Sequence, residues 1–248
     1  MQKDTRVNIK QSIPKPIKTF IKYILHCLKY DPFFVRSYSQ EGEDLLLQRF
    51  FGDKKKGFYV DVGAHHPKRF SNTLIFYRRG WNGINIDAMP GSMKLFSKER
   101  PRDINLEIPI SKEPKTLTYF QFDEPALNGF DEQLSLTREK STNYKIVSKK
   151  EIKTSTLKEI LEQHLTEQQE IDFLSVDVEG LDLEVLQSNN WLKFRPKMVL
   201  VECLKSSLSQ ITNDQIYYFL TEKGYKIYAK TVNTVFFISQ DYLAEKLK

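Results

Sequence analysis

The chain has 248 residues, of which 40% are hydrophobic and 28% charged, and this suits one folded α/β domain with additions or two small domains. Its net charge of +6 comes from residues 1–36, which hold eight Lys and Arg against two Asp, whereas the rest of the chain carries 30 basic and 30 acidic residues. A nucleic-acid-binding protein is expected to carry positive charge on its folded surface, so this distribution argues against a nucleic-acid partner.

Residues 1–36 form a basic arm in which apolar residues recur at helical spacing. These apolar positions are Ile17, Phe20, Ile21, Ile24, Leu25 and Leu28. The segment is too short and too charged to span a bilayer, and it lacks the apolar core and the cleavage site of a signal peptide. We expect residues 14–30 to pack on the domain, to contact a partner, or to lie peripherally on an anionic membrane surface.

The two cysteines, Cys27 and Cys203, lie far apart in the sequence and offer neither a disulfide framework nor a Cys-based zinc site. Cys203 lies in the apolar run MVLVECL, where a buried free thiol is expected, and free thiols are typical of a reducing compartment. We therefore expect a cytoplasmic protein, whose arm is compatible with attachment at the inner face of the membrane.

A helix and then a buried strand are predicted between residues 37 and 62. In SYSQEGEDLLLQRFF (residues 37–51), Ser39 is placed to cap a helix with an acidic first turn, and Gln40 lies just ahead of it, where it can face a crevice. Residues 58–62 have the β-branched and aromatic composition of a strand buried on both faces, and they run into the sequence GAHHP. Ligands bind at the carboxyl ends of such strands in open α/β sheets, although a core strand with an ordinary polar turn is the alternative.

Helices and strands then alternate up to residue 110. Residues 72–79 predict a helix, and residues 83–87 predict a second buried strand that ends at Asp87. An acid that ends the second strand, about 20–25 residues after the first loop, binds the ribose diol in nucleoside-cofactor folds. A helix that begins at Pro90 and a third strand at residues 104–110 follow.

Residues 112–153 are longer than one crossover connection needs and predict an insertion. Residues 117–122 alternate as an exposed strand does, and residues 144–152 are their expected antiparallel partner. The Ser-, Thr- and Lys-rich tract between these strands is predicted to be mobile. Such an insertion is the expected place for a lid or a substrate pocket.

The sheet continues after the insertion. Thr156 is predicted to cap a helix, and residues 171–178 (IDFLSVDV) predict a fourth buried strand with Asp177 near its end. After another helix, residues 198–203 predict a fifth strand that carries Glu202.

The C-terminal part predicts one more helix and a hairpin. Thr212 or Asn213 is expected to cap the helix, and the two last strands flank Asn233 as an antiparallel pair. Five strands that alternate with helices, followed by a hairpin, predict a doubly wound α/β sheet that is mostly parallel with an antiparallel edge.

Acidic residues lie at the ends of four predicted strands, and parallel strands bring these ends to one edge of the sheet. They are Asp61, Asp87, Asp177 and Glu202, with His65, His66 and Glu179 nearby in sequence. Carboxylates gathered in this way repel one another unless they bind hydrogen-bond donors, cations or a positively charged ligand. S-adenosylmethionine, which has a sulfonium and a diol, would satisfy them, and so would a divalent cation on Asp177 and Glu202.

Five motifs in this order resemble one known family. SYSQEGED, FYVDVGAHHP, GWNGINIDAMPGSM, DFLSVDVEG and MVLVEC are similar to those of the FkbM-type S-adenosylmethionine-dependent methyltransferases, and the resemblance extends from about Ser37 to the C-terminus. It implies a class I methyltransferase fold, which is a Rossmann-like seven-stranded sheet with an antiparallel last hairpin. It also implies O-methylation of a sugar or related hydroxyl in a polysaccharide or natural-product pathway.

The resemblance implies a set of cofactor-binding residues. The loop from Asp61 through Gly63 and Ala64 to His65 would hold the methionine part of S-adenosylmethionine. Asp87 would take the ribose hydroxyls, Ala88 and Met89 would flank the adenine, and Gln40 and Ser111 complete the set. The first loop departs from methyltransferases at large, because it has the single glycine Gly63 where Gly-x-Gly is usual. It also lacks the G-x-G-x-x-G of an NAD-binding module, which lowers the case for a dehydrogenase.

Methyl transfer to a hydroxyl needs an aligned acceptor oxygen and a group that removes its proton. His65 or His66 could be this base, and Asp177 is the third candidate catalytic residue. Alternatively, Mg²⁺ or another divalent cation could lower the pKa of the hydroxyl. By resemblance to metal-dependent sugar O-methyltransferases, Asp177 and Glu202, with Glu179, are its expected ligands.

Two further classes of function stay open from the sequence. A nucleotide-sugar-using transferase would need phosphate-binding residues, for which Lys68 and Arg69 are candidates. A non-catalytic Rossmann-like domain could keep the sheet and bind a partner, but the intact acids at the strand ends argue against it.

Overall fold

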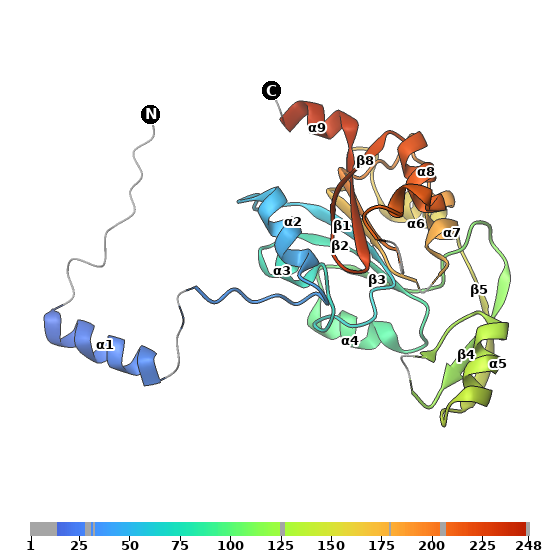
Figure 1. The fold of residues 1–248 in the computed structure, drawn as a ribbon, viewed down its shortest axis with the longest axis horizontal. Coiled ribbons are helices and arrows are strands. Elements are labelled where there is room, and N and C mark those ends of the chain that lie inside the picture. The colour runs from blue at the N-terminus through green and yellow to red at the C-terminus, as the bar shows by residue number, and fades with distance from the viewer. Residues whose placement is uncertain are drawn as a thin grey trace. The chain divides into compact units, whose positions relative to one another are not determined.

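The structure is a computed structural model, and it describes residues 14–27, 31, 33–124, 127–178, 180–203 and 207–246 (Figure 1). The chain divides into two compact units, Met1–Arg36 and Ser37–Lys248.

The first unit contains helix α1, Lys15–Cys27, in the region where the apolar spacing predicts one. Lys15, Lys18 and Lys22 lie on this helix, which has no acidic residue. Residues 28–30 of the predicted segment lie outside the described residues. Among the helices that the structure describes, none is long and apolar enough to cross a membrane.

The second unit is built on a seven-stranded sheet with the order β3-β2-β1-β6-β7-β9-β8. The strands are β1 (Phe58–Val62), β2 (Asn82–Asp87), β3 (Ile104–Glu107), β6 (Phe173–Val176), β7 (Met198–Glu202), β8 (Tyr225–Lys230) and β9 (Thr234–Ser239). The first five are parallel to one another, and β9 runs antiparallel to β7 and β8. This topology confirms the predicted doubly wound sheet with an antiparallel hairpin.

Both faces of the sheet are covered, because alternate residues of its strands enter two different cores. In β1, Val60 and Val62 belong to one core and Tyr59 to the other. The first core also contains apolar residues of α6 (Leu157–His164), α7 (Asp182–Gln187) and α8 (Gln215–Glu222). The second contains residues of α2 (Glu43–Phe51) and α3 (Leu74–Arg78), and partly buried residues of α9 (Gln240–Lys246) pack against it. Each fully buried apolar side chain stabilises the fold by roughly 1.5–3 kcal/mol.

The predicted insertion hairpin is present as an antiparallel pair, β4 (Thr116–Phe122) and β5 (Ile146–Lys153). The prediction of a mobile tract between these strands is wrong, because helix α5 (Glu132–Ser141) lies there. Asp131 caps it by accepting a hydrogen bond from the Leu134 backbone N–H. Among the residues of α5 only Ser135 is buried, so the helix lacks the apolar stripe from which a helix is predicted in a sequence.

Three predicted helix starts are placed differently in the structure. Gly42 and not Ser39 precedes α2, and Gly91 precedes α4 (Ser92–Glu99), which therefore begins after Pro90. Asp214 caps α8 by accepting from the Ile216 N–H, and the expected caps, Thr212 and Asn213, belong to a short 3₁₀ turn before it. Helix α9 was not predicted.

Candidate active site

The carboxyl ends of four neighbouring parallel strands form the candidate site. In the sheet order β2, β1, β6 and β7 are adjacent, so their ends meet at one edge. Asp87 ends β2, Asp61 lies one residue before the end of β1, Asp177 follows β6, and Glu202 ends β7. The reversal of strand order between β1 and β6 places this edge at a topological switch point, where α/β sheets bind ligands.

The loop after β1 approaches the end of β6 so closely that only glycine fits. Gly63 has a φ of 84°, and a Cβ there would lie 1.7 Å from the backbone oxygen of Asp177. The N–H groups of Gly63 and Ala64 both donate to Ile86 O, at 2.9 and 3.0 Å. Ala64 packs against Met93 of α4, so its side chain supports the loop from below.

Asp61 is buried beneath this loop. Its Oδ2 accepts a hydrogen bond of 3.0 Å from the Thr73 hydroxyl. Burial raises the pKa of Asp61 to about 6, against the opposing effects of the Arg100 guanidinium and of hydrogen bonds from Thr73 and Ser175. Asp61 is therefore charged at neutral pH and titrates only slightly below it.

Asp87 joins the loops that follow the first two strands. Its two carboxylate oxygens accept from the backbone N–H groups of His65 and Met89, each at 2.8 Å. Burial raises the pKa of Asp87, and these two hydrogen bonds oppose the shift. A carboxylate has about four acceptor positions, so Asp87 keeps capacity for a ligand's hydroxyl groups. Ala88 and Met89 beside it are half-buried.

The two histidines differ in their surroundings. His65 is exposed and has a φ of 51°, a left-handed conformation that is uncommon for a residue with a Cβ. His66 Nδ1 accepts from the backbone N–H groups of Lys68 and Arg69, each at 3.0 Å. Partial burial and nearby positive charges lower the pKa of His66. Because Nδ1 accepts hydrogen bonds, the proton of the neutral ring lies on Nε2. A neutral His66 in this arrangement has no nitrogen left to accept a substrate's proton.

A small hollow lies where β6 and β7 end. Its lining residues are Gln40, Glu41, Glu43, Phe70, Asn72, Asp177, Glu202, Asn233 and Thr234. Gln40, Asp177 and Glu202 are among the predicted site residues, and the hollow brings them together. Asn72, Asn233 and Thr234 were not predicted, since no spacing in the sequence links them to the acids.

The SYSQEGED motif holds Gln40 at this hollow through its acids. Asp44 accepts from the Ser37 hydroxyl, the Tyr38 N–H and the Ser39 hydroxyl at 2.6, 2.7 and 2.9 Å. Across the hollow, Glu41 accepts from the Asn233 N–H at 2.9 Å, and Glu43 accepts from the Thr231 hydroxyl at 3.2 Å. These acids tie the segment before α2 to the turn between β8 and β9.

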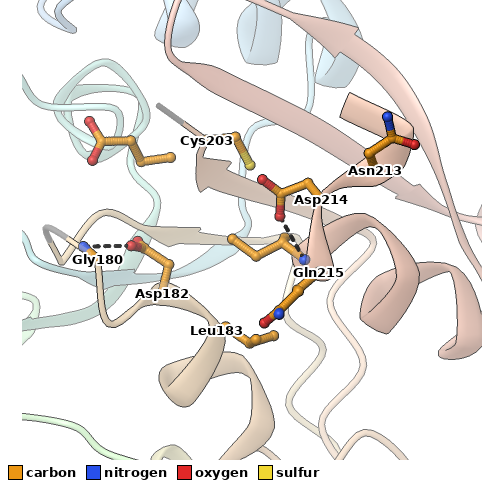
Figure 2. A pocket seen from close by; sticks show the side chains of 9 residues that line it. Gly180, Asp182, Leu183, Cys203, Asn213, Asp214 and Gln215 are labelled. Atoms are coloured by element: carbon orange, nitrogen blue, oxygen red, sulfur yellow. Dashed lines mark hydrogen bonds between the residues drawn. The ribbon is translucent and has the colours of Figure 1, made fainter. Parts of the chain in front are cut away.

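A larger cavity of about 450 Å³ adjoins the same strand end (Figure 2). Its lining residues are Gly180, Asp182, Leu183, Glu202, Cys203, Asn213, Asp214, Gln215 and Ile216. Asp182 accepts from the N–H groups of Val178 and Gly180, each at 3.1 Å, and so shapes the loop after β6. Glu202 lines both the cavity and the small hollow, so one residue borders both spaces.

Two further predicted residues lie elsewhere. Ser111 is buried, and its hydroxyl lies within hydrogen-bond distance of Glu113 O and Thr154 Oγ1, at 2.7 and 2.6 Å, at the base of the insertion. Glu179 lies outside the described residues. Within the described part of the chain, no group of three or more His, Cys, Asp or Glu side chains could hold a metal ion.

Three solved structures are similar to this chain at 10% sequence identity. An RNA methyltransferase candidate from Pyrococcus horikoshii has a TM-score of 0.40, with 88% of this chain and 98% of that chain covered. An O-methyltransferase from Bacillus cereus in complex with SAH has a TM-score of 0.37, with coverages of 92% and 93%. An O-methyltransferase candidate from Klebsiella pneumoniae has a TM-score of 0.38, with coverages of 93% and 94%.

A search of curated proteins found no match. The family model described as the methyltransferase FkbM domain matches residues 61–227, which is more than half of the chain. The protein therefore belongs to the FkbM family and is an S-adenosylmethionine-dependent methyltransferase.

Proposed function

We propose that this enzyme transfers the methyl group of S-adenosylmethionine to a hydroxyl of a sugar or glycan precursor. The observation that carries the proposal is the shared position of Glu202, which lines both the hollow at Asp177 and the cavity of about 450 Å³. A cavity of this size fits a small ligand, and carboxylate and amide groups are the partners that sugar hydroxyls need. Asn213 and Gln215, which line this cavity, have amide side chains.

The edge formed by β1 and β2 fits the methyl donor. At Gly63 the backbone of the loop after β1 lies directly against the backbone at the end of β6, with no room for a side chain. Asp87 retains acceptor capacity for a diol. Asp61, Gly63, Ala64 and His65 would hold the methionine part of the donor. Asp87, Ala88 and Met89 would hold the nucleoside, and Gln40, which lines the small hollow, completes the proposed set. S-adenosylmethionine supplies an electrophilic methyl group on a sulfonium.

In the proposed reaction the chain's residues orient the acceptor and move one proton. The acceptor hydroxyl lies in the small hollow between Asp177 and Glu202, and one of these carboxylates takes its proton as the oxygen gains the methyl group. His65 is the alternative base, but it lines neither the hollow nor the cavity. Alternatively, Asp177, Glu202 and Glu179 would hold a divalent cation in place of the general base, and the cation would lower the pKa of the bound hydroxyl.

The experiment is a calorimetric titration with S-adenosylhomocysteine, followed by transfer of a labelled methyl group to a panel of sugars, nucleotide sugars and oligosaccharides. We expect micromolar binding and labelled carbohydrate, and an Asp87→Ala variant should bind at least about tenfold more weakly. The same assays with magnesium and with a chelator test the cation. Labelling of RNA or protein in place of any carbohydrate would contradict the proposed acceptor. Full affinity in Asp87→Ala would remove its role at the ribose.

Family membership sets aside the two alternatives that the sequence leaves open. Of the candidate phosphate ligands, Lys68 forms an ion pair of 2.6 Å with Glu99, and Arg69 stacks on Phe70 with 4.5 Å between its guanidinium carbon and the ring centroid. The neutral charge of residues 37–248 supports the proposal that the acceptor is not a nucleic acid. Contact of the basic helix α1 with a membrane surface or a partner, in a cytoplasmic protein, also remains a proposal.

A further inference from the structure

Arg100 is a fully buried arginine outside the predicted site. It follows α4, and none of its side chain is exposed. Its guanidinium carbon lies 5.4 Å from the ring centroid of Phe96 and 5.7 Å from that of Tyr77. Arginine is almost never fully buried unless its donors and its charge are satisfied, so the contacts of this side chain explain its place.

Most of these contacts go to the loop that follows β1. Nε and Nη2 both donate to Pro67 O, at 3.0 and 2.6 Å, and Nη2 also donates to the Ser71 hydroxyl at 2.6 Å. Ser71 in turn donates its N–H to Tyr38 O at 2.9 Å, next to the SYSQEGED segment. One side chain therefore fastens the wall of the donor site from inside the protein.

The loop needs these hydrogen bonds because two of its residues have backbone conformations that are unfavourable for residues with a Cβ. His65 and Phe70 have φ values of 51° and 54°, and residues with a Cβ adopt such values rarely. Gly63 reaches its own left-handed conformation against Asp177 O. A loop with these conformations keeps its shape only where neighbouring groups fix it.

The same guanidinium also reaches Asp61 through one hydroxyl. Nη1 donates to Thr73 Oγ1 at 2.6 Å, and Thr73 Oγ1 donates to Asp61 Oδ2 at 3.0 Å. Asp103 lies 3.9 Å from Nη1 and accepts from the Tyr59 hydroxyl at 2.7 Å. Asp61 thus faces Arg100, Asp103 and Tyr59 as its charged or titratable neighbours, and Arg100 is the one cation among them.

We propose that Arg100 is a positioning residue for the methyl donor, which holds the loop from Gly63 to Thr73 in its binding shape and keeps Asp61 in its charged form. The inference rests on the assignment of this loop and of Asp61 to the donor, made above. The affinity for the methyl donor then depends partly on a buried side chain that acts through the loop.

Two substitutions distinguish the effect of the guanidinium's hydrogen bonds on binding from the effect of its charge. Arg100→Lys keeps a cation but cannot donate to Pro67, Ser71 and Thr73 at once, whereas Arg100→Met removes both. Arg102→Met is the matched control, because Arg102 also stacks on Tyr77, at 4.0 Å, but donates to Tyr77 O and Trp81 O in place of Pro67, Ser71 and Thr73. Each full-length variant is checked by circular dichroism and thermal unfolding and titrated with S-adenosylhomocysteine from pH 5 to 9.

We expect wild-type affinity to fall below about pH 6, as Asp61 takes up a proton. Both Arg100 variants should bind at least about tenfold more weakly at pH 7. In Arg100→Met the midpoint of the pH dependence should also rise by about 1 to 3 units, while Arg100→Lys keeps the midpoint near that of the wild type. Arg102→Met should match the wild type in both affinity and midpoint.

Folded Arg100 variants with wild-type affinity and an unchanged pH profile would overturn the proposal. An equal loss in Arg102→Met would also overturn it, because the effect would then be general destabilisation. If Arg100→Met does not fold, Ser71→Ala and Thr73→Val decide, since each removes one acceptor of Arg100. The first should weaken binding and the second should raise the midpoint, and no change in either would reject the proposal. A wild type that fails to bind would instead overturn the assignment of the donor site.

Discussion

At the scale of single residues, Asp61 illustrates a conflict between stability and ligand binding. A buried carboxylate whose pKa is raised to about 6 in the folded protein resists ionisation, so its stabilising contribution is present at low pH and is lost as the pH rises through 6. Above that pH the fold carries the cost of a buried charge that the proposed function requires. The site therefore keeps a residue that the fold alone would not favour.

An Asp61→Asn variant should consequently be more stable than the wild type at pH 7.5, by about 1–3 kcal/mol, and equal to it near pH 4, where Asp61 is protonated. Urea unfolding at both pH values measures the difference. The same variant should bind S-adenosylhomocysteine at least about tenfold more weakly, because the negative charge is gone. A variant that is less stable at pH 7.5 would show that the contacts of Asp61 with Thr73 and Ser175 outweigh its burial.

Asp177 lies at the other side of the strand edge and belongs to the proposed transfer step. Asp177→Asn should reduce methyl transfer by at least about a hundredfold and change the affinity for S-adenosylhomocysteine by less than about threefold, since a general base contributes to turnover and not to donor binding. Labelled methyl transfer and calorimetry give the two readouts. Glu167→Gln, at an exposed position, is the matched control. Full activity in Asp177→Asn would exclude this residue from the mechanism.

At the scale of the elements, local sequence signals were reliable where a cap and an apolar stripe occur together. Thr156 forms a complete capping box at α6: its hydroxyl accepts from the Glu159 N–H at 3.1 Å, and the Glu159 carboxylate accepts from the Thr156 N–H at 3.1 Å. Leu157, Ile160 and Leu161 then enter the core. Helix α5 has a comparable cap at Asp131 but no such stripe, and the sequence predicted a mobile tract in its place.

Thr156→Ala should therefore destabilise the protein by about 1 kcal/mol, the usual cost of losing a side-chain cap. Chemical denaturation measures this loss, and Thr166→Ala at an exposed turn is the control, with an expected change below about 0.5 kcal/mol. Equal stabilities of Thr156→Ala and wild type would mean that packing of the apolar face alone sets the start of α6.

At the scale of the whole molecule, the net positive charge and the folded sheet belong to different units of the chain. The second unit, Ser37–Lys248, contains the sheet, both cores and all described site residues, whereas the excess positive charge lies in the first unit. A basic segment with apolar residues at helical spacing, such as α1, is typical of helices that bind an anionic bilayer surface.

Deletion of residues 1–36 should leave a folded protein that binds S-adenosylhomocysteine as the full chain does. Sedimentation with vesicles tests the arm: the full chain should bind vesicles that contain anionic lipid and should not bind neutral ones, and the deletion should bind neither. Replacement of Lys15, Lys18 and Lys22 by Glu is the charge control. If the full chain does not bind anionic vesicles, the membrane role of the arm is rejected in favour of contact with a protein or with the domain.

The sequence by itself determined the fold class, the family and the strand ends that form the candidate site. Strands buried on both faces are continuous apolar runs, and acids such as Asp87 and Glu202 at their ends stand out against them. Only the tertiary structure decided what these groups contact. The hydrogen bond from the Asn233 N–H to Glu41 and the burial of Arg100 depend on neighbours that the loops and the sheet bring close. Arg100 in the charged sequence SKERPR carries no local sign of burial, because the acceptors of its hydrogen bonds lie 15 to 33 residues away in the chain and meet it only when the sheet is formed.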